Sequence, residues 1–159
     1  ELLSVSSNIQ PVGLGCRDSL RLEMGYCLYG NELNEETNTV EAGLSWITKY
    51  DTDFIGSKFI KDNISKRLIA ISTEERAIPR SGYKLFSMQE KEIGIITSGG
   101  MSPSLKKGIA LAYIDKEFKN ETEFKVGIRE KFFIFNKTKL PFYKEGTYLK
   151  WQIKLEFKL

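Results

Sequence analysis

The sequence predicts an α+β protein in which a partly helical N-terminal portion precedes a small antiparallel β-barrel, similar to a jelly roll. Two observations support this fold class. Before Arg67, apolar residues follow helical spacing, as in Leu20, Met24 and Leu28, which recur four apart. From Arg67 onward, short segments rich in β-branched or aromatic residues are separated by turn residues. Six such segments without an intervening helix are typical of a small barrel or sandwich.

The first 41 residues predict one helix and one polar loop. Residues 1–30 contain a helix end, a loop with Pro11, and a helix that begins after the tight entry allowed by Gly13 and Gly15. Residues 31–41 are rich in Asn, Glu and Thr and predict a loop. A lid, a helix cap and a plain solvated loop all remain open for this stretch.

The next segment leads to a predicted domain boundary. Residues 44–50 alternate as a half-buried strand does, and this pattern favours the core over a pocket for Trp46. Helical spacing returns in residues 56–66. The composition then changes at Arg67, so we assign residues 1–66 to the first domain.

Six strands are predicted in a second domain over residues 67–150. They fall at residues 67–73, 83–86, 91–99, 108–113, 123–128 and 131–137. Residues 151–159 alternate perfectly and form a separate tail. This tail is either an appended edge strand, whose lysines would guard against edge pairing, or a segment foreign to the domain.

Composition favours a soluble, intracellular protein without a membrane or nucleic-acid partner. Apolar residues make up 41% of the chain, which is enough to form a core, and charged residues make up 28%, which is enough to keep the surface solvated. No apolar stretch approaches the roughly 20 residues of a membrane helix, and no signal peptide opens the chain. The net charge of +3 is carried by scattered lysines rather than a basic patch. Such a charge suits an acidic protein or a polyanionic tail such as polyglutamate.

Metal and nucleotide chemistry find little support in the residues. Histidine is absent, and Cys16 and Cys27 lack a Cys-x-x-Cys pattern, so we expect no metal, no Cys–His nucleophile, and two buried, reduced thiols. The glycine- and serine-rich residues 99–104 lack the Gly-Lys-Ser/Thr ending of a phosphate loop. We interpret them as a tight connection between two strands.

The stretch most suited to ligand recognition is residues 13–31. Arg17 and Arg21 lie beside the apolar stripe of the predicted helix, where a guanidinium can grip a carboxylate through two hydrogen bonds. Tyr26 and Tyr29 can stack on a ring or hydrogen-bond through the hydroxyl group. The alternative is local ion pairing, of Arg17 with Glu23 or of Arg21 with Asp18.

This stretch and several others resemble the T-protein family of the glycine cleavage system, whose members are aminomethyltransferases. The matching segments occur in the family's order and cover roughly residues 10–150. They are Gly-Leu-Gly-Cys-Arg-Asp-Ser-Leu-Arg-Leu-Glu-Met-Gly from Gly13, continuing to Leu28–Leu33 and Val40–Trp46; Asp53–Gly56; Ile95–Gly99 with Ser102–Leu105; Gly108–Ala110; and Leu140–Tyr143. The Lys-Gly-Cys-x-x-Gly-Gln-Glu motif of the iron-sulfur-assembly relatives is absent.

The resemblance implies the C-terminal part of a folate-binding α/β domain followed by the barrel. Family members are more than twice as long as these 159 residues. The chain starts at Glu1 without a methionine, as if cut inside a helix, so we expect a fragment or one piece of a split protein. The family's catalytic aspartate and the glutamate that holds the pterin ring lie in the first half and have no counterpart here. No catalytic residue is therefore assigned to these residues.

The resemblance also implies a reaction and its partners. The full-length enzyme would transfer a one-carbon unit from the aminomethyl group on the lipoylated H protein to tetrahydrofolate, giving 5,10-methylenetetrahydrofolate and ammonia without a metal. Expected partners are the H protein and the N-terminal half of the T protein. The expected location is the bacterial cytoplasm, or the mitochondrial matrix in a eukaryote.

Four residues are implied as site residues by the matched segments. Arg17 would contact the benzoyl-glutamate end of the folate, with Tyr26 against the ring system, and Lys144 is a weaker candidate for the same carboxylates. Arg80 would face the active-site side of the barrel and pair with the folate tail or with acids of the lipoyl protein; a surface arginine beside Pro79 is the alternative. Arg129 and Lys131 are interpreted as solvated charges at strand ends.

Two further function classes remain open at this point. One is a non-catalytic folate-binding or regulatory module, which would bind folate without turnover. The other is a structural β-domain that ignores both folate and lipoyl protein. A related folate-dependent demethylase remains possible within the enzyme class, because the first half of the family's enzymes largely sets the choice of donor.

Overall fold

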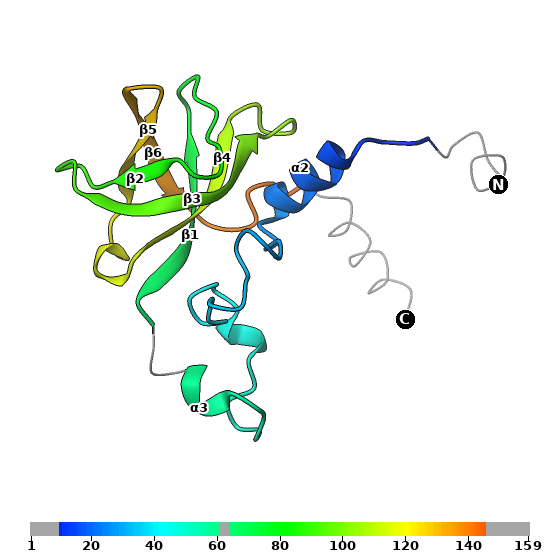
Figure 1. Ribbon diagram of the computed structural model, residues 1–159. Coiled ribbons are helices and arrows are strands. Elements are labelled where there is room, and N and C mark those ends of the chain that lie inside the picture. The colour runs from blue at the N-terminus through cyan, green and yellow to red at the C-terminus, as the bar shows by residue number, and fades with distance from the viewer. Residues whose placement is uncertain (1–9, 61–63, 146–159) are drawn as a thin grey trace.

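The protein folds as a closed antiparallel β-barrel with a helix packed beside it (Figure 1). The computed structural model describes residues 10–60 and 64–145. The helical elements are α2 (Leu14–Met24), a 3-10 helix (Ser45–Ile47), α3 (Ser57–Ile60) and a second 3-10 helix (Lys116–Phe118). The strands are β1 (Lys66–Thr73), β2 (Lys84–Phe86), β3 (Glu92–Met101), β4 (Gly108–Asp115), β5 (Glu123–Ile128) and β6 (Lys131–Thr138).

The barrel closes in the order β1-β4-β3-β2-β5-β6, with β6 pairing back onto β1. Closure leaves no strand edge open to pairing with another chain. Its interior is an apolar cluster that includes the fully buried Leu85, Phe124 and Phe135. The predicted fold class is thus confirmed.

A second, smaller cluster joins α2 to the outside of the barrel. Leu22 of α2 packs with Ala70, Ile109, Leu111 and Phe142. Figure 1 shows α2 lying beside the barrel, while the segment that carries α3 extends away from it. The last turn of α2 is therefore fixed to the barrel wall by apolar packing.

Gly25 ends α2 at a defined place. Its φ of 73° lies in the left-handed region that glycine tolerates best, and its N–H donates to the carbonyl of Leu22. The N–H of Tyr26 donates to the carbonyl of Arg21, which completes the cap. Leu28 consequently lies outside the helix, although the spacing with Leu20 and Met24 includes it in the predicted helical face.

The six strand predictions are confirmed to within two residues at each end, but the strand predicted at 44–50 is wrong. Residues 45–47 form the 3-10 helix, and Trp46 is 78% exposed rather than in the core. A short alternating run is stable as a strand only if it finds a pairing partner, and the barrel is already closed. Among the described residues of the helix predicted at 56–66, Ser57–Ile60 are helical, and Lys66 already belongs to β1.

Other expectations about burial also differ. Leu20 is exposed, because α2 turns Arg21, Leu22 and Glu23 toward the barrel instead. Cys16 is exposed on α2, so the prediction of a buried thiol there is wrong. Cys27 is half-buried, and burial, followed by the Glu32 carboxylate, raises the pKa of its thiol. Three predicted features lie outside the described residues: the helix end before residue 10, the part of the 56–66 helix at residues 61–63, and the tail at residues 151–159.

Candidate functional site

Arg21 is the most connected side chain at the junction of α2 and the barrel. Its Nε donates to Asp18 at 2.8 Å, its Nη1 to Glu32 at 3.1 Å and its Nη2 to Ser98 at 2.8 Å. The Arg21–Asp18 ion pair is one of the two local pairs that the sequence suggests. Arg17 forms no such pair with Glu23, whose carboxylate is bound elsewhere.

Glu32 is completely buried beneath this junction, although the sequence places it in a polar loop. Its carboxylate accepts from the Leu28 N–H at 2.9 Å and from the Thr97 hydroxyl at 2.6 Å, in addition to Arg21. The Tyr113 hydroxyl donates to its carbonyl at 2.8 Å. Burial raises the pKa of Tyr113, so the phenol remains a donor. In the sequence, Glu32 lies in the matched segment Leu28–Leu33, which could have drawn attention to it, but no role was assigned to it there.

Glu23 ties the end of α2 to the turn between β3 and β4. Its Oε1 accepts from the Ser102 hydroxyl at 2.5 Å and from the Ser104 N–H at 3.0 Å, and its Oε2 accepts from the Ser104 hydroxyl at 2.9 Å. Burial acts to raise the pKa of Glu23, but these hydrogen bonds outweigh it and hold the pKa below its usual value. The serine-rich turn is therefore a structural connection that also anchors α2.

Glu41 plays the corresponding part for the start of β1. Its carboxylate accepts from the Ser65 N–H at 2.8 Å and from the Lys66 N–H at 3.2 Å. Burial acts to raise its pKa, and hydrogen bonds led by the Ser65 amide lower it overall. All three buried carboxylates around α2 and its loop, namely Glu23, Glu32 and Glu41, are thus occupied by structural hydrogen bonds.

An open groove of about 740 Å³ runs beside the end of α2. Ala42, Leu44, Leu68 and Leu140 contribute apolar lining, and Tyr26, which is 58% exposed, also lines it. The exposed Trp46 stands at the same groove, next to the exposed Ile47. An exposed apolar surface of this kind is unusual unless another protein segment or a ligand covers it.

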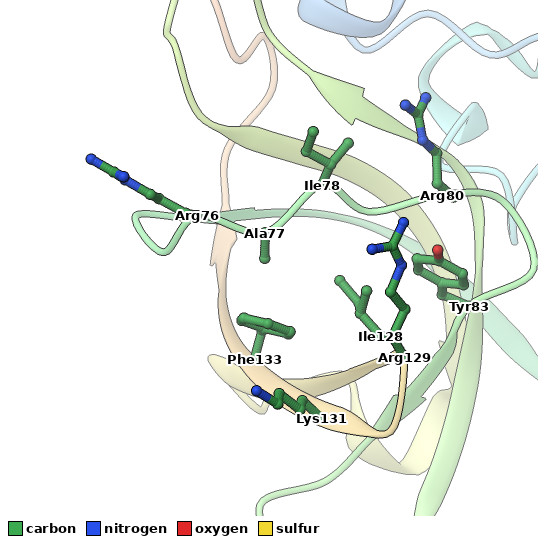
Figure 2. Close-up of a pocket in the computed structure, with 9 residues that line it drawn as sticks. All are labelled: Arg76, Ala77, Ile78, Arg80, Tyr83, Ile128, Arg129, Lys131 and Phe133. Carbon is green, nitrogen blue, oxygen red and sulfur yellow. The ribbon is translucent and has the colours of Figure 1, made fainter.

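A second cavity, of about 540 Å³, lies at one mouth of the barrel between residues 76–83 and the β5–β6 turn (Figure 2). Four cations line it together with five apolar or aromatic side chains, and none of the nine lining residues is acidic. The nine are Arg76, Ala77, Ile78, Arg80, Tyr83, Ile128, Arg129, Lys131 and Phe133. We call this cavity the basic pocket. Its mixture of positive charge and apolar wall suits an anion carried by a larger group.

The β5–β6 turn brings one of these cations to the pocket. Arg129 and Glu130 both have positive φ, 47° and 63°, as in the two-residue turns that match strand twist. Figure 2 shows Arg129 extending beside Tyr83, whereas the side chain of Arg76 points outward. Arg129 and Lys131 are exposed, as the sequence suggests, but they share a cavity with Arg80 rather than standing as isolated strand-end charges.

The four predicted site residues do not share one pocket. Arg17 is exposed on α2, and its side chain has no hydrogen bond or ion pair with other residues of 10–60 and 64–145. Tyr26 lines the groove, and Arg80 lines the basic pocket. Lys144 is exposed and follows Tyr143, whose N–H donates to the carbonyl of Glu23 at 3.1 Å, so it lies near the same end of α2 as Tyr26.

In the part of the chain that the structure describes, no three or more Asp, Glu or Cys side chains gather in a way that could hold a metal ion. None of the helices in the same residues has the length and apolar character needed to cross a bilayer.

Two family models match the chain. The model of the glycine cleavage T-protein C-terminal barrel domain matches residues 66–144, and that of the GCVT N-terminal domain matches residues 3–52. An aminomethyltransferase of Flavobacterium psychrophilum is 44% identical over 142 residues, covering 86% of this chain and 39% of that protein. An aminomethyltransferase of Pseudothermotoga lettingae is 43% identical over 150 residues, covering 91% of this chain and 41% of that protein.

A solved structure agrees with these matches. The crystal structure of glycine cleavage system aminomethyltransferase T from Bartonella henselae superposes with a TM-score of 0.80 at 33% identity, covering 89% of this chain and 42% of that one. The similarity therefore extends over both the barrel and the segment before it. The chain spans about two fifths of the length of these relatives.

Proposed function

Because the chain belongs to the T-protein family of the glycine cleavage system, we propose that it forms the C-terminal part of an aminomethyltransferase. The proposed reaction moves a one-carbon unit from the aminomethyl group of a lipoylated H protein to tetrahydrofolate and releases ammonia. The observation that carries this proposal is that the GCVT N-terminal domain model matches residues 3–52 and the T-protein C-terminal barrel model matches residues 66–144, so both parts of the chain match the same family. Tetrahydrofolate is the acceptor substrate, and the proposed chemistry uses no metal.

The proposed catalytic carboxylate comes from outside these residues. The reaction has to hold the folate nucleophile beside the aminomethyl carbon with a carboxylate nearby. Glu23, Glu32 and Glu41 lie near α2, but each is buried and accepts hydrogen bonds from neighbouring backbone or side-chain donors. A general base must be free to accept a proton from the substrate, so these three are poor candidates.

The groove beside α2 gives the remainder of the N-terminal domain a place to bind. The model of the GCVT N-terminal domain matches only residues 3–52 of this chain. Tyr26 and Trp46 line the groove and are exposed. We therefore propose that the rest of the domain covers this apolar surface and completes the folate site. We call the chain joined to that remainder, taken from the Flavobacterium psychrophilum relative, the completed enzyme.

Arg17 is proposed to contact the folate. It is exposed and has no partner among the described residues, so its guanidinium is available for a carboxylate. In the completed enzyme, Arg17→Lys is expected to weaken tetrahydrofolate binding by about 1 kcal/mol or more, roughly fivefold, because an ammonium group cannot make two parallel hydrogen bonds. Equilibrium titration with tetrahydrofolate measures this. Lys58→Arg, a conservative cation change on α3 that touches neither cavity, is the control, and an unchanged affinity of Arg17→Ala would remove Arg17 from the site.

Arg80 and the basic pocket are proposed to bind acidic groups of the lipoyl protein. Four cations without an acidic neighbour in the lining make a strongly positive surface. Arg80→Glu is expected to weaken H-protein binding about tenfold at low salt, with a smaller effect at high salt. Calorimetry of the completed enzyme with H protein tests this, with Lys58→Glu on α3 as the charge-matched control. If the affinity for folate falls while that for H protein does not, Arg80 binds the folate tail instead. If neither affinity changes, Arg80 is a surface arginine without a binding role.

A further inference from the structure

We propose that Arg21, Glu32, Thr97 and Ser98 form a latch that positions the Tyr26 wall of the folate site against the barrel. These four are positioning residues: they act through the backbone next to Tyr26 and do not touch the reacting groups. The inference rests on the proposed function, because it assumes that Tyr26 faces folate.

Arg21 fixes the first end of the segment that carries Tyr26. The side chain is only 9% exposed, and its Nη1 lies 3.4 Å from the carbonyl oxygen of Tyr26 as well as 3.1 Å from Glu32. Its Nη2 donates to Ser98 on β3 at 2.8 Å. One guanidinium thus connects the backbone of Tyr26 to the barrel wall, which a lysine at this position could not do with the same fixed geometry.

Glu32 fixes the other end of the same segment. Its carboxylate accepts one hydrogen bond from the N–H of Leu28, two residues after Tyr26, and another from the hydroxyl group of Thr97 on β3. The backbone on both sides of Cys27 is therefore held by one buried ion pair whose members are both bonded to β3. A buried pair with every partner present favours one arrangement of the chain, because each displaced group would be left unpaired.

A β-bulge in β3 makes this arrangement possible. Ile96 pairs with Ala112 and Ser98 pairs with Leu111, so Thr97 is an extra residue that has no register partner on β4, although its hydroxyl also lies 3.1 Å from the Leu111 carbonyl oxygen. In a regular strand, neighbouring side chains point to opposite faces of the sheet. Here Thr97 and Ser98 are consecutive, and both contact the Arg21–Glu32 pair. Bulges commonly redirect a side chain in this way beside functional sites.

The same stretch of β3 also hydrogen-bonds to the segment that lines the basic pocket. The carbonyl of Ile96 accepts from the N–H of Gly82 at 2.9 Å, and its N–H donates to the carbonyl of Tyr83 at 2.8 Å. Tyr83 lines the basic pocket, and Arg80 lies three residues before it. Three consecutive residues of β3 therefore contact both the basic pocket and the latch. Ile96 hydrogen-bonds to the segment that lines the basic pocket, and Thr97 and Ser98 hydrogen-bond to Glu32 and Arg21.

Glu41 provides a matched control for the test. Like Glu32, it is a buried glutamate that ties the 26–44 region to a barrel strand. Glu41 does so by accepting hydrogen bonds from backbone N–H groups, and Glu32 by accepting one from the Thr97 hydroxyl. Its contacts are at Ser65 and Lys66, not at the backbone next to Tyr26. A purely structural effect should therefore appear equally in Glu32→Gln and Glu41→Gln, whereas loss of positioning should appear only in Glu32→Gln.

Steady-state kinetics of the completed enzyme measure the difference. Glu32→Gln is expected to raise the KM for tetrahydrofolate about tenfold or more, with the KM for H protein changed less than about twofold. Glu41→Gln is expected to lower the melting temperature while leaving both KM values near those of the wild type. Ser98→Ala, paired with Ser87→Ala at a buried serine away from α2, repeats the comparison if Glu32→Gln does not fold.

The outcomes separate the latch from the function on which it rests. If the unaltered completed enzyme neither binds tetrahydrofolate nor turns over, the proposed function is overturned, and the inference falls with it. If that enzyme is active but Glu32→Gln and Ser98→Ala keep a normal folate KM, the latch is overturned while the function stands. Equal increases in folate KM for the Glu32 and Glu41 variants also overturn it, because the effect is then general loosening.

Discussion

Gly94→Ala is expected to destabilise the chain by about 3 kcal/mol or more, the largest stability change that we predict for a single methyl group. Gly94 lies inside β3 and pairs with Leu85 of β2 on one side and with Ile114 of β4 on the other. A Cβ there would overlap the carbonyl oxygen of Tyr113 and lie 2.9 Å from the Cα of Ile114. Both atoms belong to the backbone of a closed barrel, so neither can move aside without breaking strand pairs.

Gly100→Ala in the same strand is the control. A Cβ at Gly100 meets nothing within 4 Å, and its φ is not in the left-handed region. The change is expected to be neutral or stabilising by up to about 1 kcal/mol, because alanine restricts the unfolded chain. Urea unfolding of the two variants compares them directly. Equal stability of Gly94→Ala and Gly100→Ala would contradict the close backbone approach at Gly94.

The barrel could be predicted from the sequence because its signals are local. Each strand from residue 66 onward is a short run of β-branched or aromatic residues with turn residues at its ends, and such runs indicate strands without knowledge of their neighbours. The same reasoning failed for residues 44–50. Their alternation is equally regular, but a strand needs a pairing partner, and that partner is not encoded in the run itself.

The face that α2 buries could not be predicted from apolar spacing. The pattern selected Leu20 and Met24, whereas the structure buries Arg21 and Glu23 with Leu22. A charged residue is buried only where its partners are, and the partner of Arg21 on β3, Ser98, lies 77 residues away. Nothing within a helical window can reveal such a contact.

The candidate site was predicted only in part, for the same reason. The resemblance selected Arg17, Tyr26, Arg80 and Lys144, and the roles of these residues remain predictions. The basic pocket was not foreseen, because it forms only when barrel closure brings the turn at Arg129 next to the segment around Arg80. Glu32 was missed because a glutamate in an Asn/Glu/Thr-rich stretch normally indicates a solvated loop.

This chain alone is expected to show no aminomethyltransferase turnover, a complete loss relative to the completed enzyme. The three buried glutamates nearest α2 are committed to structural hydrogen bonds, and the groove at Tyr26 is open on one side. A ligand held by one wall of a cleft loses most of its burial and with it most of its affinity. No Asp or Glu of the described residues lines the open groove, so neither proton transfer nor positioning of the folate nucleophile is provided there.

The most direct measurement of the central claim is ammonia release from aminomethyl-lipoyl H protein in the presence of tetrahydrofolate. It is run on this chain, on the N-terminal remainder of the Flavobacterium psychrophilum enzyme, and on the two joined as the completed enzyme. We predict tetrahydrofolate-dependent ammonia release from the completed enzyme and none from either part. Turnover by the 159 residues on their own, or a folded completed enzyme that binds neither tetrahydrofolate nor H protein, would contradict the claim that this chain supplies the non-catalytic wall of a shared folate site.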